Sequence, residues 1–475
     1  MHHAAEEAQA SVIGRPMREE LDSLGPVLVP REALFGAQTQ RAVENFDLSG
    51  QSIRVFPDLI VSLAMVKLAA ACAHRDLGLL GTQKAAAIGA ACEEIIAGRH
   101  HDEFVVDLLQ GGAGTSTNMN VNEVVANLAL LKLGAPRGRY DLVHPLNDVN
   151  MSQSTNDVCP TAARIAIIRV CRELQEALQL LVRSLDEKAV EFDDVMKLGR
   201  TQLQDAVPMT LGLEFQAFAV MMAEDVERLR EMERLLAEVN LGGTAIGTGI
   251  NAPPGYRSAV VSHLARIAQI PVVESRHLVE ATTDPGAFVM ASALFKRVAV
   301  KLSKIANDLR LLSSGPTGGL GEISLPPVQP GSTIMPGKVN PVIPEAVNQA
   351  CFQVMGNDMT VTLAAQAAQL QLNAMQPLLV GRILESGMLM CRAARLFATK
   401  CVDGIAANRA RCRDLLESSA GVATALTPYL GYETAARVAR QCIESRRNVA
   451  DVVRELGLMD DAQVRRLLSP EHLVR

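Results

Sequence analysis

The sequence has little that would serve nucleic-acid binding. Tryptophan is absent and aromatic residues make up only 3% of the 475 residues, so few side chains could stack on bases. The 46 basic residues are outnumbered by 52 acidic ones, and the net charge of −6 leaves no basic excess to neutralise phosphates. We therefore expect no nucleic-acid partner.

Patterns that signal disulfides, metals or nucleotides are also missing. None of the nine cysteines forms a CxxC pair, no HExxH pattern occurs, and no glycine-rich strand-to-helix signature for nucleotides is present. The odd, dispersed cysteines are typical of free buried thiols in a reducing cytoplasm, where we expect the protein to work. They stand at positions 72, 92, 159, 171, 351, 391, 401, 412 and 442. The sequence predicts neither a metal site nor a cofactor.

Membrane segments are not expected either. The stretch Met1–Glu20 has no apolar core of the kind that secretory signals need. The long uncharged stretch Met359–Gly381 contains Pro377 and five Asn or Gln side chains, which a membrane span of about 20 residues does not tolerate. We expect this stretch to be a helix buried inside protein.

Long amphipathic helices dominate what is present. Apolar residues recur at intervals of three and four from Phe215 to Leu236 and again from Leu294 to Leu312, with charges on the opposite face. Val342–Leu372 reads as a third long helix that is nearly free of charge, so it needs burial on all sides. This pattern predicts an all-α protein whose central bundle of long helices also packs against other subunits.

Four polar segments rich in small residues interrupt the helices. They are segment one (110–120), segment two (152–157), segment three (199–205) and segment four (331–341). Segment four ends a stretch, 315–341, in which twelve of 27 residues are Gly or Pro, so it predicts a long loop. Their hydroxyls, amides and backbone N–H groups could bind a small carboxylate through many hydrogen bonds, and Lys338 would add one positive charge.

Each segment also has a plain structural interpretation. Segment two could be a helix N-cap, segments one and three simple turns, and segment four a flexible surface loop. Asp205 and Glu345 could be ordinary capping carboxylates. The functional interpretation gains weight because all four segments occur together on one helical scaffold.

These residues resemble the aspartase/fumarase superfamily. Segment four, with Gly331-Ser-Thr-Ile-Met-Pro-Gly-Lys-Val-Asn340, is similar to the family signature, and 29–46 is similar to its N-terminal segment. All four segments match in order, and the similarity runs from about residue 18 to about residue 465. The ammonia-lyase branch fits better than class II fumarase, because Gln202 stands where fumarases have His. Asp148 stands where relatives often have a second His, which puts any secondary anion site there in doubt.

The resemblance implies conversion of L-aspartate to fumarate and ammonia through a dianionic aci-carboxylate. Ser332 would be the base that removes the proton, assisted by Lys338, and Glu345 would orient Gln202. The resemblance also implies which residues would bind each part of the substrate. Thr115, Ser154, Thr155 and Thr333 would hold the carboxylate that becomes the aci-form, Lys338 and Asn340 the other carboxylate, and Asn156, Thr201 and Gln202 would lie near the amino group.

The resemblance further implies a homotetramer in which three subunits build each site. Three domains are expected: an N-terminal helical domain (1–151), a central long-helix bundle (152–407) and a small C-terminal helical domain (408–475). Three other functions remain open: a class II fumarase, a lyase that uses a substituted aspartate, and a non-catalytic structural or dicarboxylate-binding relative.

Overall fold

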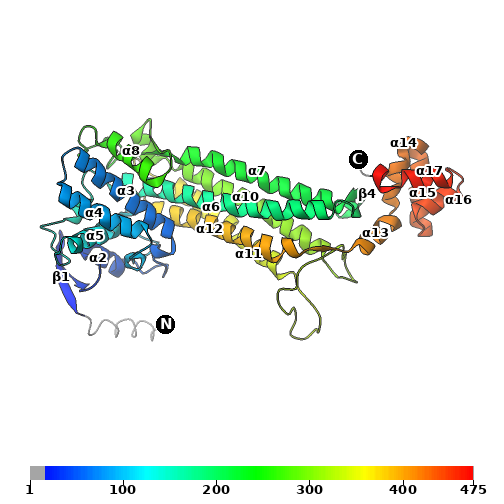
Figure 1. Cartoon of the computed structure of the whole chain (residues 1–475), viewed down its shortest axis with the longest axis horizontal. Helices are drawn as coiled ribbons and strands as arrows, with labels where there is room; N and C mark the ends of the chain where they lie inside the picture. The colour runs from blue at the N-terminus through cyan, green and yellow to red at the C-terminus, as the bar shows by residue number, and fades with distance from the viewer. Residues whose placement is uncertain (1–15, 474–475) are drawn as a thin grey trace. The chain divides into compact units, whose positions relative to one another are not determined.

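The computed structural model describes residues 16–473 and is built almost entirely from helices (Figure 1). The strands are short and form two-stranded sheets, β1–β2, β3–β4, β5–β6 and β7–β8. The all-α prediction is therefore confirmed. Most of the N-terminal stretch that lacks an apolar run lies outside the described residues.

The elements follow one another in a simple order. Up to residue 191 they are β1 (Met17–Asp22), β2 (Gly25–Pro30), α2 (Ala37–Asn45), η1 (Ile53–Val55), α3 (Pro57–Asp76), α4 (Thr82–Ile96), η2 (His101–Glu103), α5 (Thr115–Lys132), η3 (Pro145–Val149) and α6 (Thr155–Glu191). Then come β3 (Met196–Thr201), β4 (Gln204–Thr210), α7 (Leu211–Leu236), β5 (Glu238–Val239), α8 (Tyr256–Ala268), β6 (Val273–Glu274), α9 (Leu278–Thr283), α10 (Gly286–Leu312) and β7 (Ile323–Ser324). The chain continues with α11 (Val342–Gln366), α12 (Gln376–Lys400), η4 (Val402–Gly404), β8 (Ala406–Ala407), α13 (Arg409–Ser418), η5 (Ala420–Leu426), α14 (Thr427–Leu430), α15 (Tyr432–Ser445), α16 (Val449–Glu455), α17 (Asp461–Leu467) and α18 (Pro470–Leu473).

The chain divides into two compact units. The first unit consists of Met1–Glu173, Arg228–Lys296 and Gln353–Leu389, and the second of Leu174–Glu227, Arg297–Phe352 and Met390–Arg475. Five long helices, α6, α7, α10, α11 and α12, each contribute part of their length to both units. The three-domain division remains a prediction.

Helix α5 is the centre of the first unit. Every residue from Thr117 to Leu130 is buried, including four asparagines and a glutamate that must find partners inside the protein. Asn120, for example, accepts the Val105 backbone N–H and donates to the Glu103 carbonyl. The polar side chains of α5 therefore fix the loops around it as well as the helix itself.

Helix α3 lies next to α4, α5 and α8 in the same unit. Among the residues that the structure describes, it is the one helix long and apolar enough to cross a membrane, with a mean hydropathy of 1.4 in its most apolar window. That window is 78% buried within the protein, as expected for a core helix.

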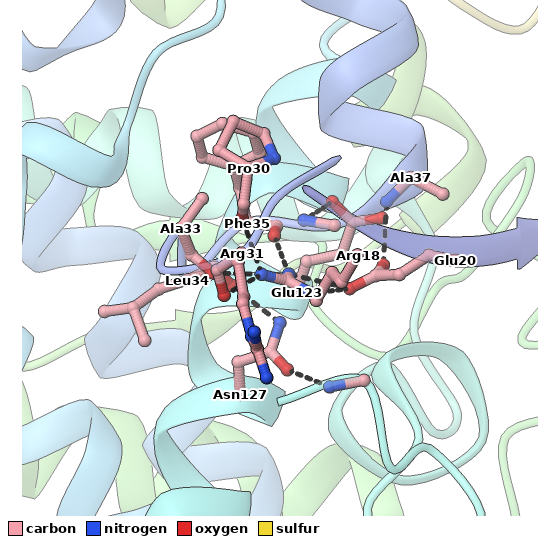
Figure 2. Close-up of polar contacts among 12 residues, drawn as sticks. Arg18, Glu20, Pro30, Arg31, Ala33, Leu34, Phe35, Ala37, Glu123 and Asn127 are labelled. Atoms are coloured by element: carbon pink, nitrogen blue, oxygen red, sulfur yellow. Dashed lines mark hydrogen bonds and ion pairs between the residues drawn. The ribbon is translucent and has the colours of Figure 1, made fainter. Parts of the chain in front are cut away.

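Two buried carboxylates, Glu123 of α5 and Glu20 of β1, hold the start of α2 (Figure 2). Glu123 of α5 accepts the backbone N–H groups of Gly36, Gln38 and Thr39 at 2.8–3.1 Å, which satisfies the first turn of α2. The Arg18 guanidinium pairs with Glu20 and donates to the backbone carbonyls of residues 30, 31, 33 and 35. These contacts hold 29–46, the segment that resembles the family's N-terminal segment.

The second unit has a C-terminal core of its own. Aliphatic side chains of α13, η5, α15, α16 and α17 form one buried cluster, including Leu426, Val438, Val452 and Leu467. Leu198 of β3 belongs to the same cluster, so the β3–β4 hairpin packs against these short helices.

Two of the three predicted long helices are confirmed. The 215–236 pattern lies in α7 and the 294–312 pattern in α10. The third prediction is wrong at its C-terminal end, because α11 stops at Gln366 and α12 begins at Gln376. The buried Asn373 donates to the Ala364 carbonyl and accepts the Met375 N–H, so its side chain satisfies the backbone where the helix breaks.

The expected burial of α11 on all sides includes contacts with other subunits, so it stays a prediction in a single chain. Within the single chain, the side chains of Phe352, Met359 and Leu363 are 58%, 62% and 60% exposed. Their spacing places them along one face of the helix. Residues 16–473 leave this apolar stripe uncovered.

Candidate active site

Segment one forms the turn that leads into α5. Gly112, Ala113 and Gly114 all have positive φ angles (84°, 56° and 95°), and α5 starts at Thr115. Gln110 accepts both the backbone N–H and the hydroxyl of Thr117 at 3.0 Å. The Thr115 hydroxyl donates to the Gly112 carbonyl at 2.7 Å, and it lies with the Thr117 donors at the positive end of the helix dipole.

Segment two forms the equivalent turn before α6. Ser154 Oγ accepts the Asn156 N–H at 3.2 Å, so the N-cap interpretation describes part of its role. Behind it, Asp157 is fully buried and accepts the backbone N–H groups of Ser154, Gly242 and Thr244 at 2.9–3.0 Å. Burial raises the pKa of Asp157 to about 6, against the lowering effect of these three N–H donors.

The structure brings segments one and two together in the first unit. The Cys159 thiol lies 3.6 Å from the Gly114 carbonyl oxygen. A Cβ on Gly114 would be 3.3 Å from the Cys159 sulfur and 3.9 Å from the Thr155 methyl carbon. Thr115 and Thr155, which the sequence places 40 residues apart, thus start two neighbouring helices.

A further loop, 240–251, contacts segment two and was missed by the sequence analysis. Asn156 donates to the Ala245 carbonyl at 2.7 Å, and Asn240 donates to the Asn156 carbonyl at 3.0 Å. This loop and 146–154 line a cavity of about 400 Å³ that Ser154 and Thr244 border. Its four glycines and two threonines within twelve residues were the available signal.

Segment three lies in the second unit and forms the β3–β4 hairpin. Thr201 pairs with Gln204, and the two connecting residues, Gln202 and Leu203, both have positive φ angles (55° and 60°). Such a turn favours Asn and Gly, so Gln and Leu here carry backbone strain of a kind that clusters at functional sites. The predicted turn is confirmed, and Thr201 and Gln202 are exposed at its tip.

Segment four, also in the second unit, is a loop whose ends meet. Asn340 Nδ2 donates to the Gly331 carbonyl at 2.6 Å, and a Cβ on Gly331 would lie 2.0 Å from the Lys338 carbonyl oxygen. Ser332 Oγ accepts two backbone N–H groups, from Ile334 at 3.2 Å and Met335 at 2.9 Å. The loop therefore gathers Ser332, Thr333, Lys338 and Asn340 in one place, with Thr333 and Lys338 exposed.

The stretch before segment four is anchored rather than free. Its β7 pairs with β8, and Arg411 donates to the carbonyls of Gly319 and Leu320. The residues from 326 onward are mostly exposed. The stretch up to β7 is therefore held by these contacts, and the exposed part of the loop begins after β7.

The remaining carboxylates have separate surroundings. Asp205 Oδ2 accepts the Ser419 hydroxyl at 2.7 Å, so it is not a helix cap. Glu345 lies in the first turn of α11. No hydrogen bond joins Gln202 to Glu345 among residues 16–473, and their pairing stays a prediction. In the same range, no group of three or more His, Cys, Asp or Glu side chains could hold a metal ion.

The first unit thus contains hydroxyls, amides and the N-termini of α5 and α6, and the second unit contains a loop that carries Ser332 and Lys338. The model of a family described as "Lyase" matches residues 25–356, and that described as "Fumarase C C-terminus" matches 422–475.

Curated relatives match over nearly their whole length. Aspartate ammonia-lyase from Pseudomonas fluorescens is 57% identical over 458 residues, covering 96% of this chain and 96% of its own. Its Escherichia coli counterpart is 47% identical, again with 96% of each chain covered. The chain belongs to the lyase family that includes the aspartate ammonia-lyases and the class II fumarases.

Solved structures agree with this assignment. A cobalt-bound "fumarate lyase:delta crystallin" from Brucella melitensis is 55% identical with a TM-score of 0.93, covering 95% of this chain and 98% of that one. The class II fumarase from Schistosoma mansoni is 34% identical with a TM-score of 0.90, covering 96% and 98%.

Proposed function

We propose that the protein is a carbon–nitrogen lyase that converts L-aspartate to fumarate and ammonia. The identity of 47–57% to aspartate ammonia-lyases over nearly the whole chain supports this activity more than the 34% identity to a class II fumarase does. Gln202 supports the same choice, because an amine that is already protonated needs no histidine acid to leave.

The difficult step is removal of a proton from the carbon beside the side-chain carboxylate. The resulting aci-carboxylate carries two negative charges, so donors must be aimed at the place where the charge develops. Thr115, Ser154 and Thr155 supply hydroxyls at two helix N-termini for this role, and Thr333 supplies a fourth.

Ser332 is the proposed base. The observation that carries this role is the pair of backbone N–H groups that Ser332 Oγ accepts, because hydrogen bonds to the charged form of a group favour that form. The alkoxide takes the proton from carbon, the electron pair forms the double bond, and the carbon–nitrogen bond breaks to release ammonia. Lys338 and Asn340 bind the other carboxylate.

The remaining roles complete the proposed site. Asn156, Thr201 and Gln202 lie near the amino group, and Glu345 orients Gln202. The positions of these residues in two separate units fit a homotetramer in which neighbouring copies share each site. The nine free cysteines, seven of them buried, fit a reducing cytoplasm.

A substrate panel tests the proposal. Purified protein is given L-aspartate, L-malate or argininosuccinate, and fumarate is followed by its absorbance. We expect release from L-aspartate alone. Release from L-malate would identify a fumarase, which the 34% identity and high TM-score to that class keep as the second candidate. No release from any of them would overturn the proposal.

A further inference from the structure

Lys67 is a buried cation whose three N–H donors are all used. It lies in the middle of α3, and its side chain is 1% exposed. Its Nζ donates to Asn118 Oδ1 at 2.8 Å, Asn150 Oδ1 at 3.0 Å and Gln153 Oε1 at 3.0 Å. An ammonium has three donors and no acceptor, so three amide oxygens match it fully.

The three acceptors belong to the two site segments of the first unit or lie beside them. Asn118 is in segment one, three residues after Thr115, and Gln153 in segment two directly precedes Ser154. Asn150 Oδ1 also accepts from Asn118 Nδ2 at 3.1 Å. Lys67 is therefore a single side chain that joins the two turns from which α5 and α6 begin.

Of the titratable groups that interact most strongly with Lys67, one is a carboxylate and the others are thiols. Cys92 of α4 and Cys159 of α6 are neutral thiols, because burial raises the pKa of Cys159 to about 12 and that of Cys92 further. Asp157 of α6 attracts the ammonium.

The titratable groups on the other neighbouring elements provide no further negative charge for Lys67. The pKa of the Tyr256 hydroxyl on α8 is raised by burial, and the His74 ring of α3 stacks on Tyr256 with a pKa lowered to about 4. Asp148 of η3 pairs with Lys84 at 2.8 Å. The ammonium thus depends on the amide oxygens and on Asp157, which itself holds segment two and the 240–251 loop.

We propose that Lys67 is a positioning residue for the elimination: the hydrogen bonds of its Nζ fix segments one and two in one register, so that Thr115 and Ser154 act on the same carboxylate. This inference rests on the proposed function. Lys67 itself contacts no reacting atom. It acts through the turns that carry the hydroxyls.

A double-mutant cycle tests this role. Lys67→Met keeps the length of the side chain and removes the donors, and Thr115→Val removes one of the hydroxyls. We expect each single change to lower kcat roughly 10²-fold. If Lys67 acts through Thr115, the double variant falls no more than about threefold below the worse single variant, because the two losses are not independent.

A second cycle separates positioning from general damage. Lys338 lies on segment four in the other unit, so the losses of Lys67→Met and Lys338→Met should multiply. A variant that merely lowers the active fraction would multiply its loss in both cycles, and that result would overturn the proposal. Lys132→Met is the matched control: it removes a lysine of α5 that pairs with Glu94 at 2.6 Å, and kcat should not change.

A substitute variant and a free choice of substrate ensure that the cycles give a result that supports or contradicts the proposal. If Lys67→Met does not assemble, the cycles use Asn118→Ala, which removes one of the three acceptors of Lys67 together with the Asn118–Asn150 hydrogen bond. The coupling is a ratio of rates on one substrate, so it can be measured on whichever substrate of the panel the wild type accepts. Failure of wild-type turnover on L-aspartate counts against the proposed function, whereas multiplicative losses with Thr115→Val count against Lys67.

Discussion

Arg200 Nη1 lies 2.8 Å from Glu322 Oε1, and the Glu322 side chain is completely buried. The other Glu322 oxygen lies 3.1 Å from Lys197 Nζ, which also pairs with Glu214 at 2.6 Å. Arg200 directly precedes Thr201 in the sequence, and Glu322 directly precedes β7. This ion pair therefore joins the strained hairpin of segment three to the anchored start of the loop that ends in segment four.

Replacing Glu322 by Gln should destabilise the protein. The change leaves Lys197 and Arg200 without the buried carboxylate that compensates them, which costs about 3 kcal/mol in the free energy of unfolding. Urea unfolding should show a lower midpoint with an unchanged slope. Glu444→Gln, a change of an exposed carboxylate on α15, should leave the midpoint within error. Equal midpoints for the two variants would contradict the structural role of Glu322.

Gly331→Ala should lower activity while stability stays close to wild type. A methyl group at residue 331 would lie 2.0 Å from the Lys338 carbonyl oxygen, so the ends of segment four would have to separate. We expect kcat to fall at least tenfold with a nearly constant Tm, because the loop is mostly exposed. Gly318→Ala is the control, since a Cβ there meets nothing within 4 Å.

Ser332→Ala should abolish most turnover and leave the fold intact. Loss of a positioned base typically costs roughly 10²–10⁴-fold in rate. Fumarate release and binding of the substrate by calorimetry should be measured together, with Ser313→Ala at the end of α10 as control. Near wild-type release by Ser332→Ala would show that another group removes the proton.

The apolar stripe on α11 predicts assembly. Phe352, Met359 and Leu363 are exposed within one chain. Such an apolar helix face is typical of a surface that another copy of the chain covers. Phe352→Glu should shift sedimentation towards smaller species. Val190→Glu, on an exposed position of α6 outside the stripe, should not. Identical sedimentation of both variants would place the subunit contact elsewhere.

The long helices could be predicted because their apolar spacing is regular over many turns, as in α7 and α10. The end of α11 could not, because the amides at 366–373 read as continued helix. Only the structure shows that Asn373 bonds to backbone groups there. Local side chain to backbone bonds of this kind leave no periodic signal in the sequence.

The segments of the proposed site could be found where residues cluster along the chain. Segments one to four are recognisable by their small polar residues, and Ser332 and Lys338 by the pattern around them. Lys67 was not, because one lysine in the apolar helix α3 forms no motif. Its meaning depends on Asn118 and Gln153, which approach it only after folding.

Lys67 also predicts an unusual dependence of stability on pH. Burial lowers its pKa from an ordinary value of 10.5 in the unfolded chain to about 7 in the fold. Between these values the unfolded chain binds one proton more than the folded protein, so this group makes the protein more stable as pH rises, by up to about 1.4 kcal/mol per pH unit. Below about pH 7 both states are protonated and the contribution is constant. Urea midpoints of the wild type and Lys67→Met should therefore be compared at about pH 7 and about pH 9.5. The midpoint of the wild type should rise relative to that of the variant at the higher pH. A difference between the two proteins that does not change with pH would mean that the ammonium keeps an ordinary pKa in its cage of amides.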